Sequence, residues 1–137
     1  MDYASIFEIS ASGMDFQAQR LEAIASNLAN INTTRGVNGR LYQPLVALAS
    51  AGGSQFDQLL GGVAEVNIVE RQTAPRLVFN PAHPDADAQG YVAMPNINPV
   101  DEMLAMMTAT RAYEANIRTL NAARTMAMRA LEIGSKG

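Results

Sequence analysis

Apolar positions near the start of the chain recur at alternating spacings of four and three residues. This spacing defines the seam of a coiled coil, in which one stripe of each helix faces its partner. No proline interrupts residues 2–31, and Asp2 has the short acceptor side chain of a helix N-cap. The pattern therefore predicts one long helix over residues 2–31. Its seam positions are Phe7, Ala11, Met14, Ala18, Leu21, Ala25 and Leu28, and Ile24 widens the apolar surface beside them.

A second long helix is predicted over residues 99–133. Its start is marked by Asn98 as the N-cap, by Pro99 in the first helical position and by two acidic residues in the positive first turn. Gly134 and Lys136 mark its end. Because this helix has a similarly spaced row, we expect the two helices to pair as an antiparallel coiled coil. The row consists of Met103, Met106, Thr110, Tyr113, Ile117, Leu120, Arg124, Ala127 and Leu131.

Glycine and proline divide the residues between the helices into short apolar runs. Residues 45–48, 64–68 and 76–79 are typical of strands, and the alternation in 64–68 indicates a half-buried one. Residues 72–75 are expected to turn one strand into the next, and the glycine pairs at 52–53 and 61–62 to act as flexible linkers.

The predicted fold class is therefore α+β, with two long terminal helices and a small β-rich module between them. We expect a discontinuous helical domain formed by residues 1–32 and 99–137, and a middle domain formed by residues 33–98. A hairpin of two helices buries only one stripe of each, so methionine- and isoleucine-rich surface is left over. Such surface indicates a partner.

Composition excludes several classes of function. The 137 residues are 48% apolar and 17% charged, with a net charge of −3, and a protein this poor in basic residues does not suit a nucleic-acid partner. There is no cysteine, which excludes disulfides and thiolate metal sites. No apolar run is long enough to span a membrane, and no basic-then-apolar leader opens the chain, so we expect no cleaved signal peptide.

The sequence offers no set of residues that suits a catalytic or metal site. His83 is the single histidine and lies near Asp85 and Asp87, in a proline-rich segment typical of a solvated turn or of a salt contact to a neighbouring subunit. The aspartates lack the further oxygen ligands of a calcium loop. We expect no enzyme activity, no catalytic residue, no metal and no cofactor.

Charge is unevenly divided between the two helices. The first is acidic, whereas the second carries Arg111, Arg118 and Arg124, which are expected to share roughly one flank. Two interpretations remain open for these arginines: a solvated face, or contacts with Asp15 or Glu22 on an adjacent subunit. The helical spacing of Met103, Met106 and Met107 likewise fits a core within the subunit or between subunits.

Four segments resemble proteins of the bacterial flagellar axis. Residues 12–30 (SGMDFQAQRLEAIASNLAN) resemble the N-terminal motif shared by rod, hook and hook-associated proteins. Residues 98–116 (NPVDEMLAMMTATRAYEAN) and 120–134 (LNAARTMAMRALEIG) look like their C-terminal motif. Residues 81–92 (PAHPDADAQGYV) are similar to the segment typical of the FlgC family of proximal-rod proteins. Residues 32–36 (NTTRG) depart from the Thr-Pro-Gly-Tyr turn of many axial proteins and suit the FlgC family better.

The resemblance implies a structural subunit of the proximal rod, exported unfolded by the flagellar type III apparatus and assembled in the periplasm. Its subunits would form a hollow helical tube that transmits torque from the membrane ring to the hook, and motility would require it. The implied partners are other copies of the chain, the proximal-rod proteins FlgB and FlgF, the adaptor FliE, the distal-rod protein FlgG and the export apparatus. The alternative is a soluble adaptor whose helical face docks one partner without polymerising.

Two sets of residues are the candidates for this role. The expected interface and coiled-coil residues are Met14, Leu21, Ile24, Leu28, Met103, Met106, Tyr113, Ile117, Leu120 and Leu131. The polar positions that match the family motifs are Asn27, Asn30, Asn98, Glu114, Asn116 and Asn121.

Overall fold

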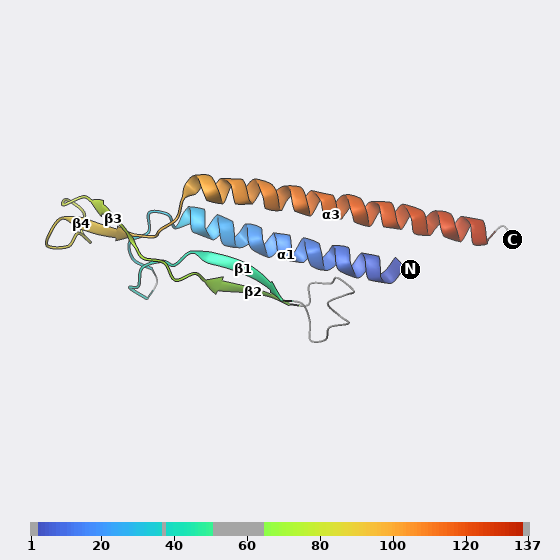
Figure 1. Ribbon diagram of the computed structural model, residues 1–137, viewed down its shortest axis with the longest axis horizontal. Helices are drawn as coiled ribbons and strands as arrows, with labels where there is room; N and C mark the ends of the chain where they lie inside the picture. Colours follow the sequence, from blue (N-terminus) through green and yellow to red (C-terminus); the bar gives the residue numbers. More distant parts are fainter. Residues whose placement is uncertain (1–2, 37, 51–64, 136–137) are drawn as a thin grey trace.

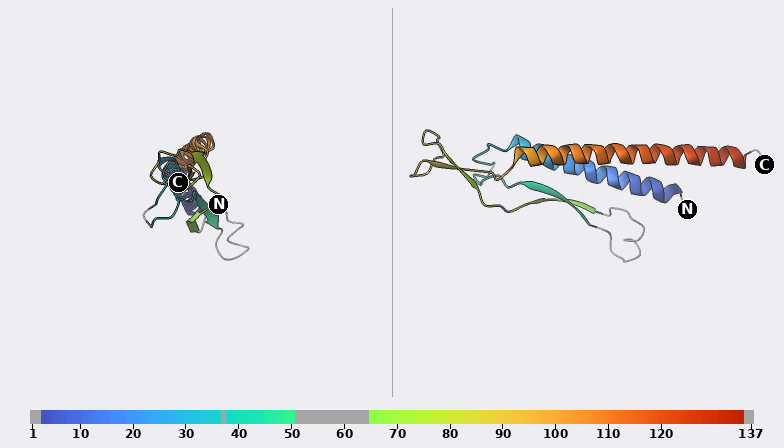
Figure 2. Two further views of the ribbon diagram at one scale, coloured as in Figure 1. Left: turned by 90° about the vertical axis from the view of Figure 1, so that its left-hand side faces the viewer. Right: turned by 45° about the horizontal axis from the view of Figure 1, so that its top comes forward.

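The computed structural model describes residues 3–36, 38–50 and 65–135. Two long helices, α1 (Tyr3–Ala29) and α3 (Pro99–Gly134), lie side by side and run in opposite directions (Figures 1 and 2). They correspond to the two helices that the sequence predicts, and the α+β class is confirmed by the strands between them. The expected roles of Asp2 and Lys136 at the helix ends fall outside the described residues.

The start of α3 has the capping arrangement that its sequence predicts. The Asn98 side-chain oxygen accepts a hydrogen bond from the Val100 N–H at 3.1 Å. Pro99 occupies the first turn, where backbone N–H groups have no partner within the helix, so its lack of an N–H costs no hydrogen bond. Asp101 and Glu102 lie in that turn, where carboxylates are stabilised by the helix dipole. These local interactions fix where the helix begins.

In the part of the chain that the structure describes, four strands form two separate antiparallel ribbons. Strand β1 (Leu45–Ser50) pairs with β2 (Glu65–Glu70), and β3 (Arg76–Phe79) pairs with β4 (Tyr91–Met94). The β1–β2 ribbon lies along α1, whereas the β3–β4 ribbon projects beyond the paired ends of the helices (Figure 1).

The ribbons correct three expectations for the middle of the chain. Residues 72–75 connect the two ribbons and do not turn β2 back onto β3. Strand β2 is largely exposed because β1 makes the closer contact with α1. Strand β4 was not predicted, because four residues between turns are too few for a clear alternation. The expected glycine linkers at 52–53 and 61–62 lie outside the described residues.

Most of the fully buried side chains on the two helices are small or polar. Ser10, Ala23, Ile24 and Asn27 are buried on α1, and Ala109 and Ala123 on α3. Gly13 lies so close to α3 that an added Cβ would approach the Asn116 amide nitrogen to 2.8 Å. Short side chains therefore allow the helices to approach each other closely.

Within one subunit, the buried positions differ by about one residue from the rows chosen by spacing. Ala11, Ala18 and Ala25 are exposed on α1, as are Thr110 and Arg124 on α3. Spacing alone cannot choose between neighbouring rows when both contain alanine. The choice is made by Gly13 and by the polar contacts of Asn27, which together fix the rotation of α1.

Candidate assembly surface

Asn27 joins three elements through one buried carboxamide. Its side chain, 2% exposed, accepts hydrogen bonds from the Leu45 N–H at 2.7 Å and from the Tyr42 hydroxyl at 3.0 Å. The same carboxamide donates to the Leu45 carbonyl at 3.0 Å and to the Glu102 carboxylate at 3.2 Å. Asn27 thus fixes the start of β1 and the first turn of α3 against the end of α1.

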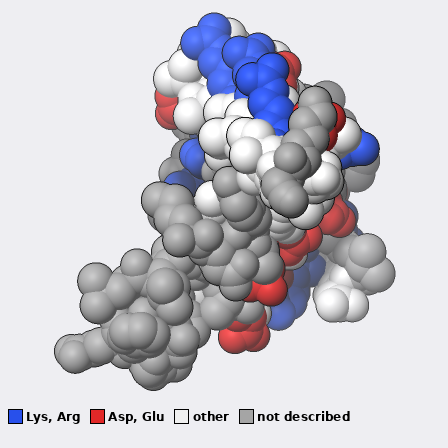
Figure 3. All heavy atoms as spheres, turned by 90° about the vertical axis from the view of Figure 1, so that its right-hand side faces the viewer, with Lys and Arg blue, Asp and Glu red and all other residues white. Residues whose placement is uncertain are grey.

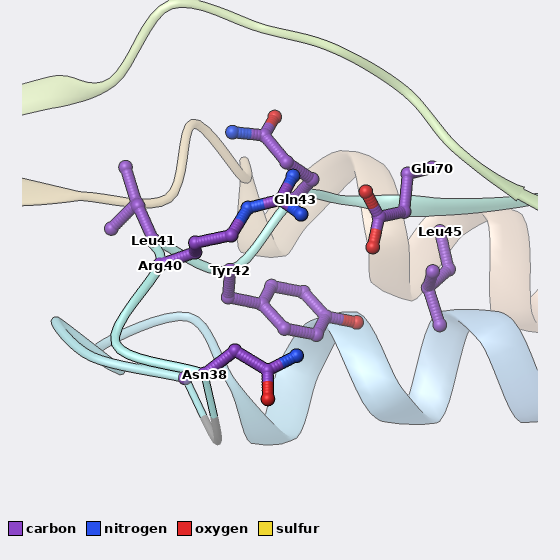
Figure 4. Close-up of a pocket in the computed structure, with 8 residues that line it drawn as sticks. Asn38, Arg40, Leu41, Tyr42, Gln43, Leu45 and Glu70 are labelled. Carbon is purple, nitrogen blue, oxygen red and sulfur yellow. The ribbon is translucent and has the colours of Figure 1, made fainter.

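Tyr42 lies in a small pocket beside this junction. The pocket has a volume of about 170 Å³, and the ring of Tyr42 lies between the 38–41 segment and β1 (Figure 4). Partial burial, reinforced by the negative charges of Glu102 and Glu70, raises the pKa of the Tyr42 hydroxyl above its ordinary value of 10.0. The phenol therefore stays protonated, as its donated hydrogen bond to Asn27 requires. The lining residues are Gly36, Asn38, Arg40, Leu41, Tyr42, Gln43, Leu45 and Glu70.

The raised pKa of Tyr42 predicts how stability depends on pH. Above about pH 10 the unfolded chain loses this proton before the folded chain does, so the free energy of unfolding should fall as pH rises further. We expect Tyr42→Phe to remove part of that fall, and to cost about 0.5–1.5 kcal/mol at neutral pH through the lost hydrogen bond. Urea unfolding at pH values from about 9 to 11 measures both effects. In the control Tyr113→Phe, which keeps Tyr42, the fall should persist; an unchanged pH profile for Tyr42→Phe would contradict the assignment.

A second junction joins the exit of α1 to the turn between β3 and β4. Asp85 accepts a hydrogen bond from the Thr34 hydroxyl at 2.7 Å and pairs with the Arg35 guanidinium at 2.7 Å. His83 accepts a hydrogen bond at Nδ1 from the Asp85 N–H at 3.1 Å, which supports its predicted place in a turn. The charged partner of Asp85 thus lies within the same chain. The position of the β3–β4 ribbon is in this way tied to the end of α1.

The outer face of α3 carries an apolar stripe near its start. Val100, Met103, Leu104 and Met107 follow the i, i+3, i+4, i+7 spacing, which places them on one side of a helix. Each is more than half exposed, from 54% for Met107 to 69% for Val100. The buried Ala109 and Ala123 lie on the opposite side, facing α1. We call these four residues the α3 stripe; no other part of the described chain covers them.

The described residues contain no helix apolar and long enough to cross a membrane, and no group of three or more acidic or histidine side chains placed to hold a metal ion.

Comparison with known proteins finds relatives that match nearly the whole chain. Residues 7–35 match the family described as "Flagella basal body rod protein", and residues 88–133 match "Flagellar basal body rod FlgEFG protein C-terminal". The chain is 39% identical to the flagellar basal-body rod protein FlgC of Escherichia coli O6:H1 (strain CFT073), with 98% of this chain and 99% of the relative covered. It is 40% identical to the protein of the same name from Bacillus subtilis (strain 168), with 92% and 94% covered.

The chain belongs to the FlgC family of flagellar basal-body rod proteins. The resemblance inferred from residues 12–30 and 98–134 is thereby confirmed. Membership of a family of structural rod proteins also agrees with the expectation that the chain is not an enzyme.

The candidate interface residues fall into two groups in this FlgC-family chain. Ile24 is buried, and a further six are half-buried: Met14, Leu21, Leu28, Met106, Tyr113 and Leu120. Met103, Ile117 and Leu131 are exposed. Leu131 is 73% exposed because α3 continues past the described start of α1 (Figure 1).

The polar motif positions have different local roles. Asn27 is the buried junction, and Asn98 caps α3. Asn30 donates to the Ser26 carbonyl and accepts from the Thr33 hydroxyl, which ends α1. Asn116 faces Gly13, while Glu114 forms an exposed ion pair of 3.9 Å with Arg118. Asn121 is exposed.

Two residues in these junctions have no signal in the sequence for their contacts with Asn27. Tyr42 follows glycine-rich turns and no periodic pattern includes it, so only the fold reveals its contact with Asn27. Leu45 was predicted within a strand, but its backbone pairing with the Asn27 side chain has no local signal.

Basic side chains gather over α3 when the molecule is viewed end-on from the side where that helix finishes (Figure 3). Arg111 and Arg118 lie seven residues apart and share one flank, about 20° from each other. Arg124 follows Arg118 by six residues, which turns it by about 240°, so the expectation that all three share a flank was wrong. Arg124 lies on a different side of α3.

Proposed function

We propose that the chain is a structural subunit of the proximal rod, which self-assembles into a hollow helical tube. The tube would transmit torque from the membrane ring to the hook, and motility would require it. The observation that carries this proposal is the α3 stripe, a continuous apolar face pointing away from the rest of the subunit. An exposed apolar face of this kind marks a protein–protein contact, which a subunit of an assembly requires.

The size of the α3 stripe suits a contact repeated along a tube. Full burial of an aliphatic or methionine side chain contributes about 1.5–3 kcal/mol, so covering four of them yields several kcal/mol in each contact. Every subunit would make that contact, so the same surface holds the whole tube together. A partner helix whose apolar residues have the same spacing could pack on the α3 stripe. The exposed interface candidates Met103, Ile117 and Leu131 would then face neighbouring subunits.

Helix spacing supports the further proposal that α1 and α3 pair as a coiled coil. Asn27 meets Glu102, and Gly13 meets Asn116. Gly13 and Asn27 lie two heptads apart on α1, and Glu102 and Asn116 lie two heptads apart on α3. The register between the helices therefore repeats as a coiled coil requires. The helical residues 1–32 and 99–137 would form one domain that lines the tube, and residues 33–98 a second domain.

The partners of this chain would be other copies of itself, FlgB and FlgF, the adaptor FliE and the distal-rod protein FlgG. Before assembly it would pass unfolded through the flagellar export apparatus into the periplasm. The absence of cysteine suits this route, because an exported unfolded chain without thiols cannot be cross-linked by oxidation. Nucleic acids and small-molecule substrates have no place in the proposal.

Electron microscopy of basal bodies purified from cells with and without this chain tests the proposed function. We expect basal bodies from cells lacking the chain to have no complete rod, and the cells not to swim. Re-expression should restore both, and antibody against the chain should label the rod. Normal rods and swimming in its absence would overturn the proposal and favour an adaptor.

A further inference from the structure

One exposed side of α1 carries only negative charge. Glu8, Asp15 and Glu22 are exposed, and their spacing of seven residues places them within about 40° of each other around the helix. None of the three forms an ion pair with a described residue, and Asp15 accepts only a hydrogen bond from the neutral Gln19 side chain. Arg20, the one basic residue of α1, lies about 120° or more from each carboxylate and lines a pocket beside β1. We call Glu8, Asp15 and Glu22 the acidic face.

One exposed side of α3 is basic, in keeping with the basic side chains gathered over this helix (Figure 3). Arg111, Arg118 and Arg129 are exposed and lie within about 20° of each other around the helix. Arg111 and Arg129 form no ion pair in the described part of the chain. Arg118 lies 3.9 Å from Glu114, which is beyond hydrogen-bonding distance, and an exposed pair of this kind contributes little. Glu114 and Glu132 lie about 60° to one side of Arg111. We call the three arginines the basic face.

The acidic and basic faces point away from each other within one subunit. Gly13 of α1 meets Asn116 of α3, where an added Cβ would approach the amide nitrogen to 2.8 Å. Asp15 and Arg118 each follow one of these residues by two positions, which turns each of them by about 200° away from the other helix. The two faces therefore lie on opposite outer sides of the paired helices. Their charges are complementary, but only two different copies of the chain can bring them together.

The two faces match in spacing as well as in sign. Copies that follow one another in a tube point the same way, so α1 of one copy runs antiparallel to α3 of the next. If Asp15 lies opposite Arg118, then Glu22 lies opposite Arg111, because both pairs of positions are separated by seven residues. Glu8 then lies within about one helical turn of the third arginine of the basic face. In this register each acid of one face has a basic partner on the other.

The residues between the charges fit the same register. Ala11 and Ala18 lie beside the acidic face, Ala115 and Ala122 lie beside the basic face, and all four are exposed. Ala18 comes to lie opposite Ala115 when the charges are paired as above. Ala11 comes to lie opposite Ala122. Small side chains at these positions allow two helices to approach closely, so that the charged side chains can reach each other.

A shift of the register by one heptad loses this match. In one direction Glu22 would lie opposite the apolar Leu104, and in the other Glu8 would lie opposite Glu132. An unpaired carboxylate against an apolar surface and a contact between like charges are both unfavourable. The charges therefore select one register.

We propose that the acidic face on α1 of one copy of the chain packs against the basic face on α3 of the next copy. This proposal rests on the proposed function and deepens it, since it names two surfaces that join neighbouring copies and the register between them. A contact between two different faces of one chain is heterologous, so it repeats from copy to copy and generates a ring or a helical tube instead of a closed dimer. It also assigns Arg111 and Arg118 to contacts with an adjacent subunit.

Disulfide cross-linking tests the register, because the natural chain has no cysteine. Two full-length double variants are expressed as the sole copy in cells, and their basal bodies are purified and mildly oxidised with copper phenanthroline. Ala18→Cys with Ala115→Cys should give a ladder of cross-linked copies, and so should Ala11→Cys with Ala122→Cys. The controls recombine the same four positions as 18 with 122 and 11 with 115. Each control pair is displaced by seven residues, or about 10 Å, so about tenfold less product is expected, since disulfides need Cα atoms within about 7 Å.

Exchange of charges tests the pairing without cysteine. Glu22→Arg and Arg111→Glu should each lower the amount of this chain in purified basal bodies by about tenfold, because each places like charges opposite one another. The double variant Glu22→Arg with Arg111→Glu restores opposite charges and should return the amount to within about twofold of the natural level. Arg124→Glu makes the same change on a different side of α3 and should lower the amount by less than about twofold.

Cross-links of position 18 with 115 and of position 11 with 122, together with restoration by the charge exchange, support the proposal. Four results overturn it and leave the proposed function standing: equal product from the recombined pairs, no product or links only to a different rod protein in basal bodies that contain the chain, single reversals without effect, or a double exchange that restores nothing. The charge exchange decides the question even if a cysteine variant is not incorporated. Basal bodies that lack the natural chain in swimming cells would instead refute the proposed function.

Discussion

Replacing Met103 with aspartate is expected to abolish incorporation of the chain into the rod. Met103 belongs to the α3 stripe and is 57% exposed, so the substitution should change the free energy of unfolding of the subunit by no more than about 0.5 kcal/mol. In an assembled rod the new carboxylate would have to lose its water in every copy of the contact, without a partner. Swimming in soft agar and immunoblots of purified basal bodies measure the effect in cells that lack the natural copy.

Met103→Leu is the matched control, because it keeps an apolar side chain of similar size. It should retain swimming and rod incorporation at close to the natural level. Cells that swim with Met103→Asp would show that the α3 stripe faces solvent in the rod. Loss of swimming in both variants would point to a requirement for the methionine itself and not for an apolar surface.

Asn27→Asp should cause the largest loss of subunit stability among single substitutions of similar size. The Asn27 carboxamide donates to Glu102 at 3.2 Å, so the change places two carboxylates at hydrogen-bonding distance in a buried site. It also removes the donor to the Leu45 carbonyl. We expect a decrease of about 2–4 kcal/mol in the free energy of unfolding at pH 7, measured by urea unfolding followed by circular dichroism.

Asn32→Asp makes the same chemical change at an exposed position close to Asn27. It should alter the free energy of unfolding by no more than about 0.5 kcal/mol. Equal losses in the two variants would mean that added negative charge, and not the junction at Asn27, causes the effect.

Sequence patterns predict the long elements of this fold well, because their signals are local and repeated. Asn98 and Pro99 are adjacent in sequence and together mark the start of α3, and the predicted N-cap is present. Strand β3 is likewise bounded by the residues that the pattern indicates. Each of these features depends on neighbours in sequence, so each can be inferred without knowledge of the fold.

Contacts between distant residues were harder to infer. Asn27 matched a family motif, but nothing near it in sequence indicates that Tyr42, Leu45 and Glu102 converge on its side chain. The pairing of α1 with α3 was expected, yet its rotation depends on the close approach at Gly13 and on this convergence. The sequence pattern identified only part of the α3 stripe: Met103 was a candidate interface residue, whereas Val100 and Leu104 were not. The predicted row of apolar positions lay to one side of the helix face that the fold leaves exposed.

The bond between Asn27 and Glu102 also has a consequence for the order in which the subunit acquires its structure. The two residues are 75 positions apart, and closing so long a loop carries an entropic cost that local turns and helices avoid. Because α1 and the β3–β4 ribbon need only neighbouring residues, they can form before that closure, and the union of α1 with α3 comes late. Until then the apolar sides of both helices remain separate, and the subunit has no finished surface to offer to a growing filament. If the rod assembles as proposed, a chain would become competent to join it only after this contact has formed.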